Sequence, residues 1–129
     1  MVRYSEKKQV MWTHFKLHEF DSPDEPGSGA RMDRDFMDML DVARSISGCS
    51  YKITSGYRTA KHNKKIGGTP KSSHLRGKAA DISCPTSTLR YRIISGLIAA
   101  GFTRIGIGPN FIHVDNDSVK TPGVAWLYA

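Results

Sequence analysis

The sequence is poor in cysteine and has no long hydrophobic run. Its two cysteines, Cys49 and Cys84, are too few for a disulfide framework, and neither belongs to a C-x-x-C pair. The longest apolar run, residues 93–100, is interrupted by Ser95 and Gly96 and is too short to cross a bilayer. We expect buried free thiols, with a single bridge between them as the alternative, and no membrane span.

The N-terminus also lacks the apolar core of a signal peptide. It reads M-V-R-Y-S-E-K-K, with basic residues followed by no hydrophobic segment. We therefore expect synthesis in the cytoplasm without export by the general pathway. The length of 129 residues fits one domain, predicted to cover 1–129, and 39% apolar with 24% charged residues is typical of a soluble globular protein.

Positive charge exceeds negative charge along the chain. The net charge is +7 and the pI is near 9.6, a balance that favours polyanions such as nucleic acid, anionic lipid or an acidic cell wall. No nucleic-acid-binding motif is recognisable, and the few aromatic residues near the basic run argue against a base-stacking platform. We therefore expect no nucleic-acid partner. If the protein did bind nucleic acid, its binding affinity would fall steeply with salt concentration.

Periodicity and turn residues predict an α+β fold. Apolar residues at spacings of three and four predict main helices over 31–47 and 86–100, each followed by glycine. Thr59 is placed to cap a short helix through Ile66, and 21–29 is a loop rich in proline, glycine and acids. Strands are predicted at 51–54, 78–83, 103–107, 111–115 and 124–128. The sum is a small antiparallel sheet with helices packed against it.

The strand F-I-H-V-D carries the clearest chemical pattern. Residues two apart on a strand point to the same face, so His113 and Asp115 project together while Ile112 and Val114 face the core. Asp115 then has two candidate roles. It orients a ring nitrogen of His113, or it accepts a proton from water as a general base.

A second segment, S-S-H-L-R-G-K-A-A-D, supplies His74 and Asp81. A lone histidine in a loop is usually solvated, and a lone aspartate that ends a strand usually forms a turn. Together with His113, however, these residues form the ligand set of a catalytic zinc, with three protein ligands and a fourth position for water. The combination predicts a metal site if the two segments converge.

The run S-G-Y-R-T adds a cation to this site. Arg58 follows a strand and a glycine turn, so we expect it to bind a substrate carboxylate or stabilise an oxyanion, with an Arg–Asp surface bridge as an equal alternative. His62, His14 and His18 are predicted to be structural or surface residues. Trp126 is predicted to be a core aromatic rather than a cleft residue.

Three segments together resemble a known family: S-G-Y-R-T-A-K-H-N-K-K-I-G-G, S-S-H-L-R-G-K-A-A-D-I and F-I-H-V-D. They are similar to the zinc D-alanyl-D-alanine carboxypeptidases, peptidoglycan metallopeptidases that share a fold with the hedgehog signalling domain, over about residues 15–126. The resemblance implies a zinc ion held by His74, Asp81 and His113, with Arg58 in substrate binding or oxyanion stabilisation. It also implies a substrate with D-configured residues. The run E-F-D-S-P-D resembles compact versions, some of them phage-encoded.

One departure from the family pattern concerns the general base. Several relatives carry an acidic or histidine base a few residues before the last ligand, whereas residues 107–111 here offer none. Asp115 is therefore the predicted general base, unless another residue enters the site.

The sequence thus predicts a zinc metallopeptidase that hydrolyses stem or cross-link peptides of peptidoglycan, of carboxypeptidase or endopeptidase type. We expect a monomer that acts on the cell wall, for which a phage endolysin or virion enzyme would explain the missing signal peptide. The alternative is a non-catalytic, zinc-containing cell-wall binding module.

Overall fold

The computed structural model describes residues 12–128, so the N-terminal run read for a signal peptide lies outside the described residues. A five-stranded sheet with strand order β1-β2-β4-β3-β5 forms its centre. The strands are β1 (Ile53–Ser55), β2 (Ala79–Ser83), β3 (Arg104–Ile107), β4 (Phe111–Asp115) and β5 (Val124–Leu127). The α+β class is confirmed. That residues 1–129 form one domain stays a prediction.

Three α-helices lie within two or three residues of their predicted bounds because their caps are encoded locally. They are α1 (Arg34–Ser47), α2 (Ala60–Lys65) and α3 (Ser87–Ala99). Side chains of Asp33, Thr59 and Thr86 accept the capping hydrogen bonds at their N-termini, as such residues do at helix starts. Three short 3-10 helices are η2 (Leu17–Phe20), η3 (Ser28–Arg31) and η4 (Ser73–Arg76).

The sheet is mixed rather than wholly antiparallel. β2 pairs antiparallel with β1 and β4, and β3 pairs antiparallel with β4, so β3 and β4 form a hairpin. β5 pairs with β3 in parallel. The segment 116–123 after β4 returns to the start of β3, where the backbone N–H groups of Gly123 and Val124 donate to the carbonyl oxygen of Thr103. β5 therefore has to run in the same direction as β3.

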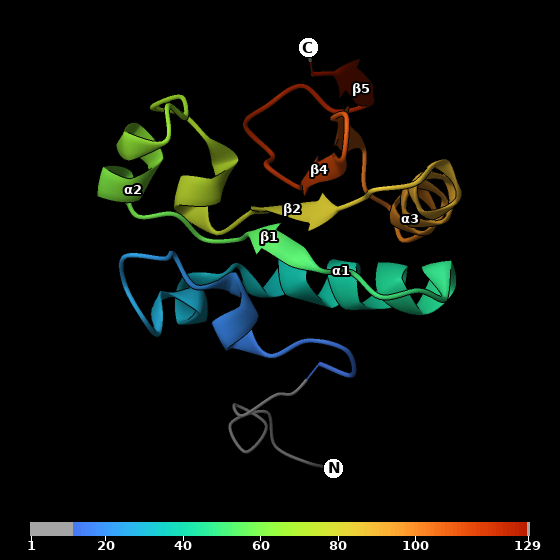
Figure 1. Ribbon diagram of the computed structural model, residues 1–129, viewed down its shortest axis with the longest axis horizontal. Helices are drawn as coiled ribbons and strands as arrows, with labels where there is room; N and C mark the ends of the chain where they lie inside the picture. The colour runs from blue at the N-terminus through green and yellow to red at the C-terminus, as the bar shows by residue number, and fades with distance from the viewer. Residues whose placement is uncertain (1–11, 129) are drawn as a thin grey trace.

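The helices α1 and α3 cover one face of the sheet (Figure 1). Fully buried side chains from both layers form the core between them: Phe36, Met37, Leu40, Ala80, Ile82, Ile93, Leu97, Ile112 and Val114. Gly96 lets α3 approach α1 closely, since a Cβ atom there would lie 2.0 Å from Oγ of Ser47. The other sheet face, including His113 and Asp81, is therefore left for the functional groups.

The helical spacing of apolar residues predicts that Ile46 of α1 and Ile98 of α3 belong to the buried faces, and this is wrong for both. They are 51% and 59% exposed. The buried stripe of α3 is formed by Ile93, Gly96 and Leu97, and Ile98 lies one position beyond it.

Both cysteines are free thiols, with Cys84 buried and Cys49 partly exposed. Within residues 12–128, no helix has the length and apolar character needed to span a bilayer.

Candidate metal centre

A row of residues in register crosses all five strands on the sheet face away from α1. Ser55 pairs with Asp81, Asp81 with His113, His113 with Gly106, and Gly106 with Trp126. Neighbours in register on adjacent strands point to the same face. Two candidate ligands from separate sequence segments are thereby placed side by side at the centre of the sheet.

His74 joins this pair from η4. One ligand atom from each of His74, Asp81 and His113 lies within 4.8 Å of the others. The Nδ1 atom of His113 is 3.0 Å, and the Nε2 atom of His74 3.3 Å, from the same oxygen, Oδ1 of Asp81. Two imidazole nitrogens and one carboxylate oxygen converging on one point fit a zinc site with three protein ligands.

The ring of His74 is aimed by its backbone surroundings. Its Nδ1 atom lies 2.7 Å from the carbonyl oxygen of Gly56, so Nδ1 carries the proton and Nε2 is left to bind a metal. Gly77 ends η4 with a φ of 68°, and a Cβ atom there would lie 2.4 Å from the carbonyl oxygen of Arg31. Glycine is therefore required at this turn. The hydroxyl of Ser73 also donates to Asp117 at 2.6 Å, which ties η4 to the segment after β4.

The opposite side of the His113 ring is held by Asp115. Oδ2 of Asp115 lies 2.8 Å from Nε2 of His113, while Oδ1 accepts hydrogen bonds from Nε of Arg104 at 2.7 Å and from the backbone N–H of Asp117 at 3.2 Å. Asp115 is fully buried. Both of its oxygens are engaged on the side of the ring away from Asp81. Of the two roles predicted for Asp115, this geometry favours the orienting partner over the general base.

At this site, hydrogen bonds and neighbouring charges shift the pKa values of Asp81 and His113 in the direction opposite to the effect of burial. Burial alone raises the pKa of Asp81, but hydrogen bonds with His113 and His74 outweigh it and hold that pKa well below its usual range. Burial lowers the pKa of His113, but its hydrogen bonds to Asp115 and Asp81 raise it overall. Burial also raises the pKa of Asp115, but its contacts with His113, Asp117 and Arg104 lower that pKa overall, so both carboxylates are ionised at neutral pH. A divalent cation would replace the proton shared between His113 and Asp81.

Arg58 lies beside the carboxylate of Asp81, as the sequence predicted. Its Nη2 atom is 3.4 Å from Oδ2 of Asp81, Nη1 donates to Oδ1 of Asn63 at 3.1 Å, and Nε donates to Oγ of Ser55 at 3.0 Å. The side chain also lines the cleft above the candidate ligands. The structure thus contains an Arg58–Asp81 contact, and the role of Arg58 in binding substrate stays a prediction.

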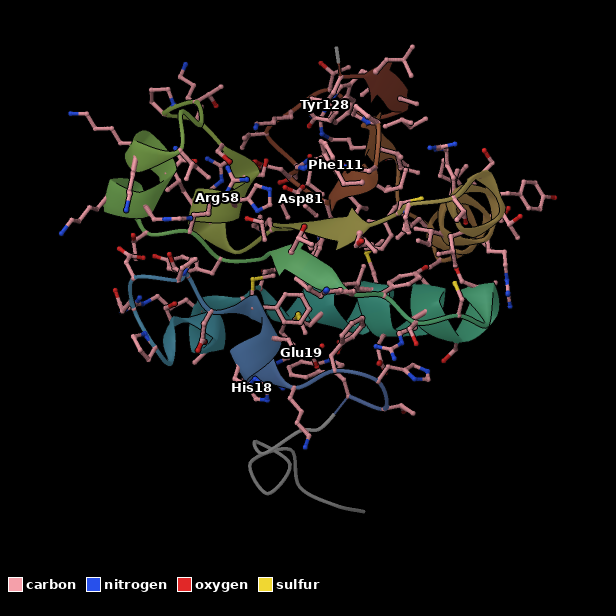
Figure 2. The ribbon with its side chains drawn as sticks, in the orientation of Figure 1. His18, Glu19, Arg58, Asp81, Phe111 and Tyr128 are labelled. Atoms are coloured by element: carbon pink, nitrogen blue, oxygen red, sulfur yellow. The ribbon has the colours of Figure 1, made fainter. Side chains whose placement is uncertain are left out.

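The cleft has a volume of about 370 Å³ and contains residues that the sequence alone did not place there. These are Arg104, Lys120, Trp126 and Tyr128; Trp126, predicted to be a core aromatic, is a cleft residue instead. In Figure 2, Arg58, Asp81, Phe111 and Tyr128 lie on the side of the sheet away from α1.

Gly106 makes room for the two C-terminal aromatic rings. A Cβ atom at this position would lie 2.6 Å from the ring of Tyr128 and 2.7 Å from Nε1 of Trp126. The guanidinium of Arg104 also packs over the Trp126 ring, 5.0 Å from its centroid. A glycine inside the strand R-I-G-I is the sequence signal that indicates such a close approach.

The remaining histidines stay apart from this centre. His14 contacts Oγ of Ser45 through Nε2 at 2.7 Å, which agrees with a structural role. In the part of the chain from 12 to 128, His74, Asp81 and His113 form the one cluster of three potential ligands close enough to hold an ion.

Comparison with known proteins agrees with this geometry. No curated protein matches the chain significantly. The sequence model of the family described as Peptidase M15 matches residues 13–115, a segment that contains all three candidate ligands and most of the chain. Peptidases of this family depend on zinc. The chain therefore belongs to the peptidase M15 family of metallopeptidases.

Proposed function

We propose that this chain is a zinc-dependent peptidase that hydrolyses peptidoglycan peptides, either the stem peptides or their cross-links. The observation that carries the proposal is the convergence of Nε2 of His74, Oδ1 of Asp81 and Nδ1 of His113 within 4.8 Å. The resemblance to D-alanyl-D-alanine carboxypeptidases supports a substrate with D-configured residues. The net charge of +7 suits an acidic cell wall.

These three side chains would hold the zinc ion. When bound in such a site, zinc lowers the pKa of a water molecule to near 7 and polarises a carbonyl oxygen. The protein supplies the orientation of the ligands. The carbonyl of Gly56 fixes the tautomer of His74, and the carboxylate of Asp115 fixes the ring of His113.

Two further groups are placed to bind substrate. Arg58 is held by Ser55, Asn63 and Asp81, so its guanidinium is preorganised to stabilise negative charge on the substrate carbonyl or to bind a carboxylate. Burial raises the pKa of Tyr128, so its hydroxyl stays protonated at neutral pH and acts as a hydrogen-bond donor at the cleft.

A specific observation favours a second candidate, a zinc-containing module that binds the cell wall without cleaving it. Among the lining residues of the cleft within 12–128, the carboxylates are those of Asp81 and Asp115, and both are already engaged. The role of Asp115 as general base stays a prediction. A peptidase without a strong base would be slow, and a binding module needs none.

A turnover assay separates the two candidates. Zinc-loaded protein and its His113→Ala variant are incubated with isolated cell walls, and soluble products are identified by mass spectrometry. We expect peptide fragments or free D-alanine from the wild-type protein and none from the variant. Zinc-loaded wild-type protein that sediments with the walls and releases nothing would be the binding module.

A further inference from the structure

Asp117 is a buried carboxylate to which the proposed function gives no part. It is 2% exposed, the same as His74 of the candidate metal centre. A buried charge is costly unless hydrogen bonds and an opposite charge compensate for it. Asp117 also lies two residues beyond the segment that the family model matches, so membership of the family assigns it no role.

The carboxylate of Asp117 is engaged by two residues of η4. Oγ of Ser73 donates to Oδ2 at 2.6 Å, and Nη2 of Arg76 forms an ion pair with the same oxygen. Ser73 is buried, whereas the side chain of Arg76 is 43% exposed. Because exposed ion pairs contribute little, the buried hydrogen bond from Ser73 is the stronger link. Ser73 and Arg76 lie on either side of His74 in the chain.

His74 is the candidate ligand that most needs such support. Asp81 and His113 lie opposite each other on the paired strands β2 and β4, so the sheet fixes their spacing. His74 lies instead on η4, a single turn of four residues. A turn of this length has few hydrogen bonds of its own and does not persist in isolation. The place of His74 above the sheet therefore depends on contacts with neighbouring segments.

A second contact of Asp117 reaches the support of the other histidine. Its backbone N–H donates to Oδ1 of Asp115 at 3.2 Å, and Oδ2 of Asp115 lies 2.8 Å from the ring of His113. The backbone of residue 117 thus contacts the group that orients His113, while its side chain contacts the turn that carries His74. These two contacts can be separated, since a substitution at 117 removes the side chain and keeps the N–H.

From these contacts we propose that Asp117 is a positioning residue of the metal centre. Its carboxylate holds Ser73, and with it the turn that carries His74, where this histidine can bind the same ion as the two ligands on the sheet. The inference rests on the proposed zinc site and adds to it a residue that touches neither metal nor substrate. Loss of the carboxylate should displace His74 and leave Asp81 and His113 in register.

Zinc affinity tests this role in three variants. Asp117→Ala removes the carboxylate, and Ser73→Ala removes the hydroxyl that donates to it. Ser47→Ala is the matched control, because Ser47 is also a buried serine, whose hydroxyl contacts Tyr51 and Arg92 between α1 and α3. We expect affinity, measured by competition with a chelator, to fall at least about 10-fold in the first two variants. The control should bind zinc like the wild type.

A spectroscopic signature separates positioning from a general loss of stability. Cobalt(II) is bound in place of zinc, and its visible absorption depends on the number and geometry of its ligands. We expect the absorption band to change in Asp117→Ala and in Ser73→Ala, because His74 no longer lies at its proper distance from the ion. Ser47→Ala should keep the wild-type spectrum even where its unfolding midpoint falls.

Hydrogen exchange of the metal-free protein follows η4 without any metal. The backbone N–H of Arg58 donates to the carbonyl oxygen of His74 at 3.1 Å, and that of Lys78 to the carbonyl oxygen of Ser73 at 3.1 Å. We expect these two amides to exchange at least about 10-fold faster in Asp117→Ala, since the turn opens locally. The amides of β2 and β4 should keep their wild-type rates.

The outcomes distinguish this inference from the proposed function. Wild-type zinc affinity and cobalt spectra in Asp117→Ala and Ser73→Ala would overturn the inference and leave the zinc site standing. An equal loss in Ser47→Ala would also overturn it, because the effect would then follow stability. Wild-type protein that binds no zinc would overturn the proposed function, and the inference with it. If Asp117→Ala does not fold, Ser73→Ala, which removes a single oxygen atom, decides.

Discussion

The Nε2 atom of His113 lies 2.8 Å from Oδ2 of Asp115, two residues further along β4. The other ring nitrogen, Nδ1, faces Asp81 at 3.0 Å. One imidazole therefore links a buried carboxylate on one side with the candidate metal centre on the other. This link gives Asp115 an orienting role that can be tested separately from a role in proton transfer.

Replacement of Asp115 by asparagine should weaken zinc binding. The amide keeps the shape of the side chain but loses the charge that orients and polarises His113, and such partners typically contribute about 10–100-fold in metal affinity. Zinc affinity is measured by competition with a chelator of known affinity. Asp35→Asn, at an exposed position in the first turn of α1, is the control and should bind zinc like the wild type.

The same variant decides between the two roles predicted for Asp115. A general base does not contribute to metal affinity. Unchanged zinc affinity in Asp115→Asn, combined with a large loss of turnover, would contradict the orienting role and favour the general base.

Replacement of Arg58 by lysine should lower kcat/KM by about 100-fold or more, the usual cost of losing a preorganised donor to an oxyanion. Lysine keeps the charge but not the planar fork that contacts Ser55, Asn63 and Asp81 together. Zinc content should stay the same, which metal analysis checks. Arg90→Lys on α3 is the control. Activity of Arg58→Lys within a factor of two of the wild type would show that Arg58 has a structural role alone.

Substitution of Gly106 by alanine should displace the aromatic wall of the cleft. The new methyl group would lie within 3 Å of both Trp126 and Tyr128, and such overpacking costs about 1–3 kcal/mol. We expect a raised KM with retained zinc, measured by steady-state kinetics and metal analysis. In a Trp126→Ala background the same substitution should raise KM by a smaller factor. Equal increases of KM in both backgrounds would show that the contact between residue 106 and Trp126 does not matter.

Much of this architecture could be predicted because it is encoded locally. Gly48, Thr59 and Thr86 mark helix ends through their own backbone or side-chain preferences, so the helices lie close to their predicted bounds. The alternation of Ile112, His113 and Val114 likewise fixes which side chains of β4 face the core.

The parts that could not be predicted depend on contacts between distant segments. The direction of β5 follows from the course of 116–123, which no local pattern encodes. That segment also brings Lys120, and β5 brings Trp126, to the cleft. The orienting role of Asp115 depends in the same way on Arg104, eleven residues earlier in sequence and on the neighbouring strand.

The pH dependence of stability should include a contribution from Tyr51. Its side chain is 2% exposed, and burial raises its pKa to about 12, although the hydrogen bond with Ser47 opposes the shift. The unfolded chain has an ordinary tyrosine pKa of about 10. Because the folded pKa is the higher one, this contribution is fully present below about pH 10 and is lost as the pH rises toward about 12. The loss is on the order of 2 kcal/mol.

This loss is measured by denaturant unfolding at about pH 8 and at about pH 11.5. The second pH lies between the unfolded and the folded pKa of the tyrosine. Tyr51→Phe should lose less stability over this interval than the wild type. Tyr91→Phe, at a position that is 76% exposed, should behave like the wild type. The same pH dependence in Tyr51→Phe as in the wild type would contradict the assignment.

Zinc stoichiometry tests the central claim, that His74, Asp81 and His113 together hold one catalytic ion. The measurement is the zinc content of the wild-type protein and of His113→Ala after zinc loading and removal of unbound metal. We predict about one zinc per wild-type chain and none in the variant, with both proteins folded by circular dichroism. Equal zinc content in the two proteins, or none in the wild type, would contradict the account.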